Sequence, residues 1–484
     1  MKARLMATFV AEENRKWWTL GAVAFGLFMI MLDNTVVNVA LPTMKKDLHV
    51  NTAQLEWVVV AYALTFAALL ITGGKLGDLY GRRRLFVIGL VIFTASSLAC
   101  GLASSAGFLI GARAVQGVGA ALMNPATLSI IAATFPPKER GRAIGIWAGV
   151  SALALAIGPL VGGVIVEKLN WNWIFFVNIP IGILGIVASQ VFIKESRDTS
   201  HEQSLDLPGL ATSALGLFTL SYALIEGNDK GWASPEILAF FVAAVVLLGA
   251  FVVLELYQRL PMLDLSLFKI GSFSGANTVA MLVSMGMFGV FFFVSLYIQN
   301  ILHYSAIQAG AMFLPMTVLI IVIAPIAGQL SDRVGARWLM GAGMTIVGIS
   351  LLLYQRATVD STFWTLLPAM VLGGVGMAMT MSPMTAAAMG SVPVDKAGVG
   401  SGVLNSFRQV GGSLGIALMG AILAAYLHHN PKTEPLAAAR DYVNGMHAAL
   451  AVSAAISFAA AIVAVVFVRT KPAVVREHLA EMAA

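Results

Sequence analysis

Three ionisable side chains stand in the middle of long apolar segments, where charge is costly. Asp33 is the only mid-segment carboxylate, and Arg113 and Arg408 are the two mid-segment cations. Acids inside a membrane mark proton or ion pathways by default. Burial favours the neutral acid and a nearby guanidinium favours the carboxylate, so a balanced acid can load and release a proton. We therefore predict proton coupling at Asp33 and Arg113. Structural pairing or capping is the alternative for all three charges.

Polar side chains near these charges are candidates for a substrate cavity. Two asparagines follow Asp33 on its own segment, and a glutamine follows Arg113. We predict that the cavity is lined by Asn34, Asn38, Gln116, Asn124, Asn405 and Arg408. Asp33, Arg113 and Arg408 are expected to converge on it.

A charged loop between two apolar segments supplies a second candidate site. It runs from Gly74 to Arg84 and holds one acid, Asp78, among four cations. A weaker copy begins at Gly328, 254 residues later, with Asp332 in the place of Asp78. Because these charges lie at the membrane surface, we predict that they gate the cytoplasmic side and bind no substrate. The predicted gating residues are Gly74, Asp78, Gly81, Arg82, Arg83, Asp332 and Arg333.

Glycine and proline interrupt another segment. Pro159 removes a backbone donor and bends a helix, and the glycines leave one helix face without bulk. We predict a kinked helix that slides against a neighbour, with ordinary small-residue packing as the alternative. Its residues are Gly158, Pro159, Gly162 and Gly163. Glu226, at the outer end of a later segment, is either an outer-vestibule acid or a solvated loop acid.

The composition places the chain in a bilayer. Of its 484 residues, 58% are hydrophobic and only 11% charged, whereas a soluble domain carries roughly 25% charged residues. Apolar runs of about 20 residues cross a bilayer as helices. We predict fourteen, at 17–40, 54–74, 84–103, 107–134, 141–165, 172–193, 206–226, 234–255, 272–300, 307–330, 337–355, 363–390, 399–427 and 444–468.

The distribution of cations orients these spans. With both termini in the cytoplasm, 21 of the 30 Lys and Arg residues fall on the inner side and 7 on the outer side, as the positive-inside rule requires. We find no nucleotide-binding loop, no nucleophile motif and no metal-ligand spacing. We therefore expect no enzyme activity, no cofactor and no metal.

The internal repeat also locates an insertion. The charged loop recurs eight spans later, and so does the run around Pro125 and Gly141, which reappears around Pro383 and Gly398. A six-span repeat with two inserted spans fits both offsets. We expect the inserted pair, which has no mid-span charge, at the periphery beside the seam between the halves. The predicted parts are a cytoplasmic N-terminus at 1–16, a six-helix bundle at 17–195, an inserted hairpin at 203–258, a second six-helix bundle at 270–470 and a cytoplasmic tail at 471–484.

Together these motifs resemble the major facilitator superfamily, specifically its fourteen-helix drug:proton antiporter branch. The resembling segments are 32–42, 74–84, 109–121, 154–163 and 171–182. Leu79 and Ala154 depart from the family pattern, in which a basic residue and a glycine are usual. The resemblance implies an all-α integral membrane protein with the major-facilitator fold, built from two six-helix bundles plus two inserted helices. It also implies that Asp78, with Arg82 or Arg83, latches the cytoplasmic side of an outward-open state.

The function that this resemblance implies is proton-coupled multidrug efflux by alternating access. Its partners would be an amphiphilic small molecule, protons and the lipid bilayer, without nucleic acid. We expect a protein of the bacterial cytoplasmic membrane that works as a monomer, and a periplasmic adaptor stays an open alternative. An exporter of an endogenous metabolite, siderophore or lipid would have the same coupling residues. A membrane receptor or scaffold is a poorer fit, because it would not need mid-span charges.

Overall fold

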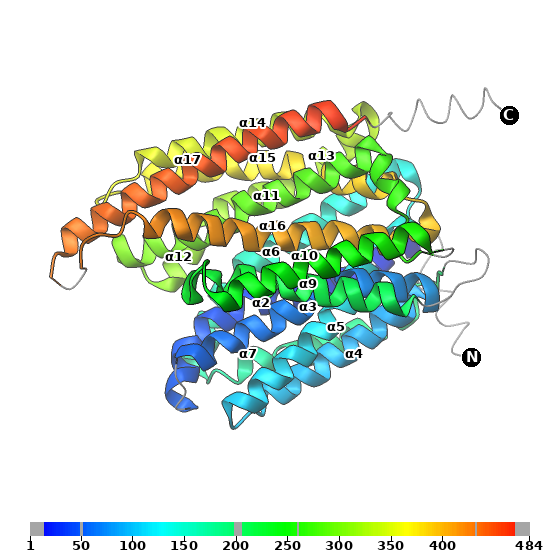
Figure 1. Cartoon of the computed structure of the whole chain (residues 1–484), viewed down its shortest axis with the longest axis horizontal. Coiled ribbons are helices and arrows are strands. Elements are labelled where there is room, and N and C mark those ends of the chain that lie inside the picture. Colours follow the sequence, from blue (N-terminus) through cyan, green and yellow to red (C-terminus); the bar gives the residue numbers. More distant parts are fainter. Residues whose placement is uncertain (1–13, 49–51, 198–205, 259–260, 431–432, 470–484) are drawn as a thin grey trace.

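The protein is built from long helices that run roughly along one direction (Figure 1). The computed structural model describes residues 14–48, 52–197, 206–258, 261–430 and 433–469. Within those ranges every regular element is a helix and none is a strand. A helix satisfies its own backbone hydrogen bonds, which a lipid environment demands. The all-α fold class is confirmed.

The first six predicted spans correspond to seven helices. Ser105 caps one of them, since its side chain accepts a hydrogen bond from the Phe108 amide. Gly81 lies between the second and third helices at a φ of 108°, a conformation that favours glycine. The helices are α2 (Arg15–Asp47), α3 (Thr52–Tyr80), α4 (Arg82–Gly101), α5 (Ala106–Thr134), α6 (Pro137–Lys168), α7 (Trp173–Phe176) and α8 (Asn178–Phe192).

The remaining helices follow in the predicted order. The inserted pair is α9 (Leu207–Lys230) and α10 (Pro235–Tyr257). The last six spans comprise η2 (Leu265–Lys269), α11 (Gly271–Leu296), η3 (Tyr297–Ile301), α12 (Ala306–Met312), α13 (Leu314–Val334), α14 (Ala336–Leu353), η4 (Tyr354–Arg356), α15 (Phe363–Gly390), η5 (Val394–Lys396), α16 (Ala397–Ala424) and α17 (Pro435–Phe467).

Length and hydropathy identify a multi-pass membrane protein. Twelve helices in the described ranges are long and apolar enough to span a bilayer. The other two predicted spans coincide with α6 and α11, which have 32 and 26 residues. At 1.5 Å per residue, even the shorter helix reaches about 39 Å, more than the ~30 Å hydrocarbon core. The count of fourteen stays a prediction.

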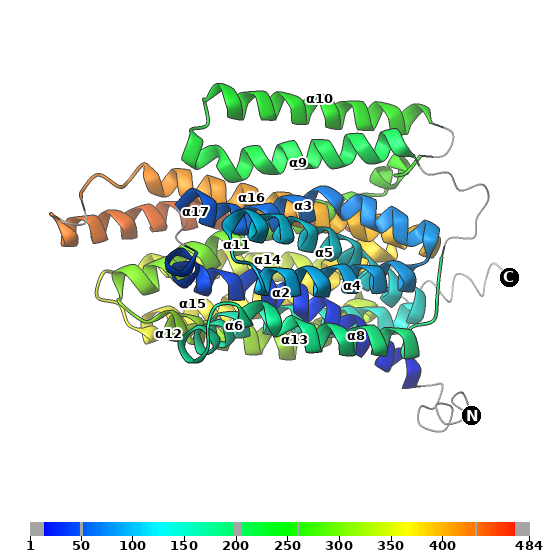
Figure 2. The ribbon, with the colours of Figure 1, turned by 90° about the horizontal axis from the view of Figure 1, so that it is seen from below.

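The inserted pair of helices lies at the edge of the molecule (Figure 2). Helix α9 packs against α3 and α16, while α10 packs chiefly against α9. Only 17% of the most apolar stretch of α10 is buried, so most of that helix faces away from the rest of the protein. At its end the Glu255 carboxylate is buried and accepts a hydrogen bond from the Leu263 amide at 3.0 Å. The hairpin therefore covers the seam between the first six and the last six spans.

Two helix pairs make the largest contacts across that seam. Helix α6 packs along α13, and α3 packs along α16. Each pair joins a helix of the first six spans to a helix of the last six. The start of α2 and the end of α17 lie at the same end of the molecule (Figures 1 and 2). The charged segments 74–84 and 328–337 lie at that end too. They are predicted as loops from the sequence, but they are helical except at Gly81 and Gly335, because α3 and α13 continue up to those glycines and α4 and α14 begin directly after them.

Candidate coupling and gating sites

The Asp33 carboxylate is bound inside the first six spans. Asp33 on α2 is 0% exposed and Arg113 on α5 is 1% exposed. Arg113 Nη1 donates to Asp33 Oδ2 at 2.5 Å and to Gln116 Oε1 at 2.8 Å. Its Nε donates to the Val58 carbonyl at 3.0 Å. A buried ion pair needs such additional hydrogen bonds to offset the loss of hydration.

The second oxygen of Asp33 also accepts hydrogen bonds. Gln116 Nε2 donates to Oδ1 at 3.0 Å and Asn178 Nδ2 at 3.3 Å. Asn178 also donates to Ser97 Oγ at 3.0 Å, which holds its amide in place. Both oxygens of the Asp33 carboxylate therefore accept hydrogen bonds from side chains of the first six spans. Sequence reasoning did not select Asn178 as a site residue, although it lies in the resembling segment 171–182.

Two aromatic rings also lie beside the Arg113 guanidinium. Its guanidinium lies 4.3 Å from the centre of the Tyr62 ring and 5.9 Å from that of Phe175. A ring face attracts a cation, more strongly where water is excluded. Arg113 therefore keeps two rings and the Val58 carbonyl as partners if Asp33 becomes neutral. The arrangement lets the acid change its charge without leaving the cation wholly uncompensated.

The other cavity candidates lie in different surroundings. Asn124 on α5 is 2% exposed, and its Oδ1 has no hydrogen-bond partner among the described residues. Asn405 donates to the Ser401 carbonyl at 2.9 Å. Asn34 is half-buried, and the side chain of Asn38 lies outside the described part of the structure.

Arg408 does not join the Asp33 pair. Its Nη2 donates to Thr385 Oγ1 on α15 at 2.6 Å, and its guanidinium lies 5.6 Å from the Trp147 ring of α6. Asp33 and Arg113 pair with each other within the first six spans, whereas Arg408 lies at the seam. The expected convergence of the three charges on one cavity stays a prediction.

Asp78 links the first charged loop to the other side of the seam. Its Oδ1 accepts from the Gly398 amide and its Oδ2 from the Val399 amide, both at 2.9 Å. These amides belong to the first turn of α16, where free N–H groups and the helix dipole favour an anion. Arg82 pairs with Asp78 at 2.8 Å and also donates to the carbonyls of Val394 and Asp395. Asp78 and Arg82 together form a latch between α3 and the start of α16.

Arg83 contacts a different part of the chain from Arg82. Its side chain lies 3.8 Å from Glu195, and its amide donates to the same carboxylate at 3.0 Å. Glu195 follows α8, so this contact stays within the first six spans. Of the two candidate partners for Asp78, the structure selects Arg82.

The second charged loop makes a weaker version of this contact. Asp332 accepts from the Gly141 amide at the start of α6 at 3.2 Å. Arg333 is exposed, and Ala336 occupies the position that corresponds to Arg82. The second loop therefore lacks the buried arginine that pairs with Asp78 in the first.

The two repeats found in the sequence contact each other reciprocally. A Cβ on Gly74 would overlap the Gly398 carbonyl oxygen, and one on Gly328 would overlap that of Gly141. Gly141 and Gly398 are themselves counterparts in the repeat. Each charged loop thus closes on the matching glycine of the other six spans. Both contacts need bare backbone, because any Cβ would hold the helices apart.

Gly74→Ala should therefore open this end of the molecule. In a Cys100→Ala background, we expect a cysteine placed at the buried Ser401 to react with a maleimide several-fold faster when Gly74 is alanine. Gly77→Ala is the matched control, because a Cβ there meets nothing within 4 Å. Equal labelling rates in the Gly74 and Gly77 variants would contradict the contact.

The interrupted helix packs against the helix that carries Asp33. A Cβ on Gly158 would overlap Thr35 Oγ1. One on Gly162 would lie 2.9 Å from the Val36 side chain, and one on Gly163 the same distance from Ile307 of α12. The Pro159 side chain lies outside the described residues. Thr35 and Val36 follow Asp33 closely in α2. Movement of α6 would therefore displace the turn of α2 that carries Asp33.

Glu226 belongs to a polar cluster at the end of the hairpin opposite the chain termini (Figure 2). It lies 3.7 Å from Lys230, which in turn contacts Glu236 at 2.6 Å. Hydrogen bonds to Glu236 and Tyr222 raise the pKa of Lys230. This cluster joins α9 to α10, away from the contact between α3 and α16.

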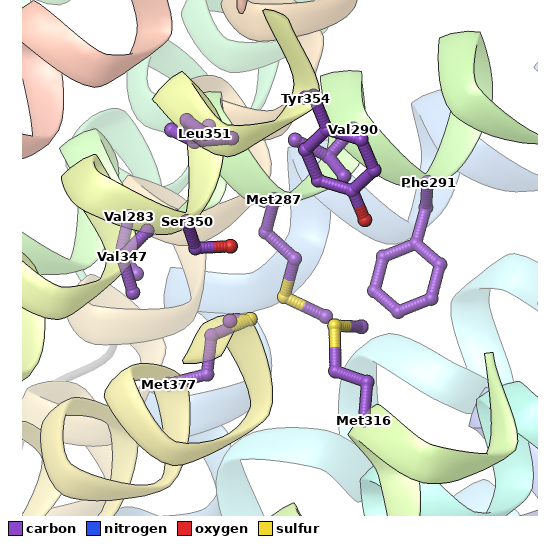
Figure 3. Close-up of a pocket in the computed structure, with 12 residues that line it drawn as sticks. Val283, Met287, Val290, Phe291, Met316, Val347, Ser350, Leu351, Tyr354 and Met377 are labelled. Atoms are coloured by element: carbon purple, nitrogen blue, oxygen red, sulfur yellow. The ribbon is translucent and has the colours of Figure 1, made fainter. Parts of the chain in front are cut away.

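A small, mostly apolar pocket lies within the last six spans (Figure 3). Met287 of α11 and Met316 of α13 extend into it beside Phe291, and the Tyr354 hydroxyl points inward. Methionine side chains adapt readily to irregular space. The pocket is separate from the Asp33 pair, since its lining comes from α11, α13, α14, α15 and η4.

Comparison with known proteins identifies the family. A model described as Major Facilitator Superfamily matches residues 23–289 and 276–483. The multidrug resistance protein Stp of Mycobacterium tuberculosis (strain CDC 1551 / Oshkosh) is 36% identical, covering 84% of this chain and 76% of its own. The tetracenomycin C resistance and export protein of Streptomyces glaucescens is 35% identical, with 85% and 77% covered. Puromycin resistance protein pur8 of Streptomyces alboniger is 35% identical, with 95% and 92% covered.

Solved structures agree on the fold. The human organic anion transporter MFSD10 superposes with a TM-score of 0.67 at 13% identity, covering 94% of this chain and all of its own. The proton:xylose symporter XylE superposes with a TM-score of 0.66 at 14% identity, covering 95% and 97%. At such low identity the likeness concerns the fold alone. The sequence matches and the shared fold place this chain in the major facilitator superfamily.

Proposed function

We propose that this chain is a drug-efflux transporter that exports amphiphilic small molecules in exchange for protons. The relatives named for multidrug, tetracenomycin C and puromycin resistance support export of such molecules. Proton coupling rests on one observation above all. Asp33 is a fully buried carboxylate held by Arg113 and two side-chain amides. An ion pair of this kind can switch between a charged and a neutral acid as access alternates.

The transport cycle that we propose uses both sites. With the charged loops in the cytoplasm, the Asp78–Arg82 latch closes the inner side and favours an outward-facing state. A proton entering from outside neutralises Asp33 and releases its hold on Arg113. Since α6 contacts α2 beside Asp33 and also lines the seam, this local change can be transmitted to the packing of α6 on α13. The inner side then opens, the proton leaves and substrate binds.

The membrane, the orientation and the oligomeric state that we propose follow from the same argument. We propose a monomer in the bacterial cytoplasmic membrane with both termini inside, oriented by the cations of the inner loops. The two six-helix bundles at 17–195 and 270–470 would move against each other, and the hairpin at 203–258 would support the seam. No adaptor subunit is required for this cycle.

Inside-out vesicles test the function directly. Vesicles from a host without its own efflux pumps would receive an imposed pH gradient, acidic inside, and a panel of neutral, cationic and anionic fluorescent amphiphiles. We expect accumulation of at least one class that collapses when nigericin dissipates the gradient. Vesicles without the protein serve as the control. Accumulation that persists after the gradient is dissipated would rule out proton exchange.

A further inference from the structure

Arg408 is a half-buried cation that no carboxylate compensates within the described residues. Its side chain donates to the neutral hydroxyl of Thr385 at 2.6 Å. Its Nε is buried and has no hydrogen-bond partner among those residues. Arg82 and Arg113, by contrast, are both fully buried and paired with aspartates. An unpaired cation inside a membrane protein is costly, so its persistence calls for a function.

The groups around Arg408 come from both sides of the seam. Its guanidinium lies 5.6 Å from the ring of Trp147 on α6. Trp147 Nε1 donates to Thr127 Oγ1 at 3.0 Å, and Thr127 donates to the Asn124 carbonyl at 2.7 Å. The Asn124 side-chain oxygen is buried without a partner in the described part of the chain. An aromatic ring and a cation without a carboxylate partner in the described residues therefore meet at the seam.

We propose that Arg408 binds the anionic group of an acidic amphiphilic substrate. A guanidinium offers a planar set of donors that matches a carboxylate or phosphate in two-point contact. The free Nε–H supplies one donor for that contact once the seam opens, because Nε is buried in this structure. Trp147 is only 3% exposed, so its ring becomes a surface for the apolar part of the same molecule in that open state. The substrate's acid is thus the missing counter-charge. This inference rests on the proposed function, and it narrows the substrate class.

The position of the site explains why binding would be conformation-dependent. Arg408 and Thr385 belong to the last six spans, whereas Trp147 belongs to the first six. Because this structure brings the two together with Trp147 buried, a substrate that contacts both needs a state in which the seam has opened. Its affinity therefore differs between states, which is the requirement for a ligand to shift a conformational equilibrium.

A matched pair of ligands tests the proposal. The probes are an anthracene-based carboxylic acid of amphiphilic shape and its methyl ester, and binding to purified protein is followed by probe fluorescence. We expect the wild type to bind the acid at least tenfold more tightly than the ester. Arg408→Gln should abolish that preference and leave ester affinity unchanged, and Arg408→Lys should restore part of it. Trp147→Leu should weaken both ligands to a similar extent.

Thermal unfolding separates this role from a structural one. Arg408→Gln removes an uncompensated charge, so the midpoint of unfolding should stay the same or rise. A clear fall would identify a structural cation and overturn the proposal, as would a wild type without preference for the acid. Vesicle transport is read separately. Binding selectivity without proton-driven transport would refute the proposed function and leave the anion site standing.

Discussion

Asp33→Asn is expected to abolish proton-driven export. The amide cannot take up and release a proton, and its single oxygen can replace only one of the two carboxylate oxygens that accept from Gln116 and Arg113. Removing the partner of a buried ion costs about 3–5 kcal/mol where nothing else compensates it. Here the Val58 carbonyl and the Tyr62 ring remain with Arg113. We therefore expect folded protein with gradient-driven uptake at background in inside-out vesicles.

Substrate exchange without a gradient distinguishes loss of coupling from loss of the transporter. The Asp33→Asn variant should still exchange labelled for unlabelled substrate, because exchange needs alternating access but no net proton movement. Asn178→Ala is a graded comparison. It removes one hydrogen bond from Asp33 and should shift the pH dependence of transport without abolishing it. Full gradient-driven uptake by the Asp33→Asn variant would remove Asp33 from the coupling role.

Asp78→Asn should depress turnover much more than substrate binding. The substitution replaces a carboxylate that accepts from two amides of α16 and pairs with the buried Arg82. Hydrogen bonds to charged groups contribute about 1.5–3 kcal/mol each. Losing one such contribution shifts the balance toward the inward-open state by roughly 10- to 100-fold. We expect a similar fall in turnover and a much smaller change in equilibrium substrate affinity.

The second charged loop provides the matched control. Asp332→Asn removes an acid from the corresponding position, where Ala336 replaces the arginine and the Gly141 amide donates at 3.2 Å. Its effect on turnover should be clearly smaller than that of Asp78→Asn. Equal losses of turnover from both substitutions would show that the contacts of Arg82 add nothing to the role of Asp78. Loss of substrate affinity in Asp78→Asn with an unchanged conformational balance would disprove gating.

Local sequence pattern was sufficient to locate most of the helices. Each predicted span coincides with one long helix or, at 172–193 and 307–330, with two consecutive helices, because apolar length is a local property that the bilayer selects directly. Positive φ at both Gly81 and Gly335 agrees with the predicted repeat of the charged loop. The sequence also showed that the charged segment and the run around Gly141 each recur at a fixed offset. It did not show that these segments contact each other, because no local pattern records which surfaces meet.

Pairing of charges was decided only by the tertiary structure. Asp33 and Arg113 were chosen from the sequence because each is expensive in an apolar segment, yet they are 80 residues apart and their contact depends on how α2 packs on α5. Asn178 was not selected because one amide in a run of apolar residues has no distinctive spacing. Arg408 was expected to line the same cavity as Asp33, and only the structure showed that its partners at the seam are Trp147 and Thr385.

The sequence by itself therefore determined the class of protein, the helices and a small set of charged residues. Burying these residues in a membrane costs so much free energy that they are expected to have a function. Cost in a membrane depends on residue type and depth, and both can be read from one chain. Only the tertiary structure decided which cation compensates which acid, and which cation has no acid beside it among the described residues. Those outcomes depend on distances of a few ångström between distant segments, and they separate the Asp33–Arg113 pair, the Asp78–Arg82 pair and Arg408.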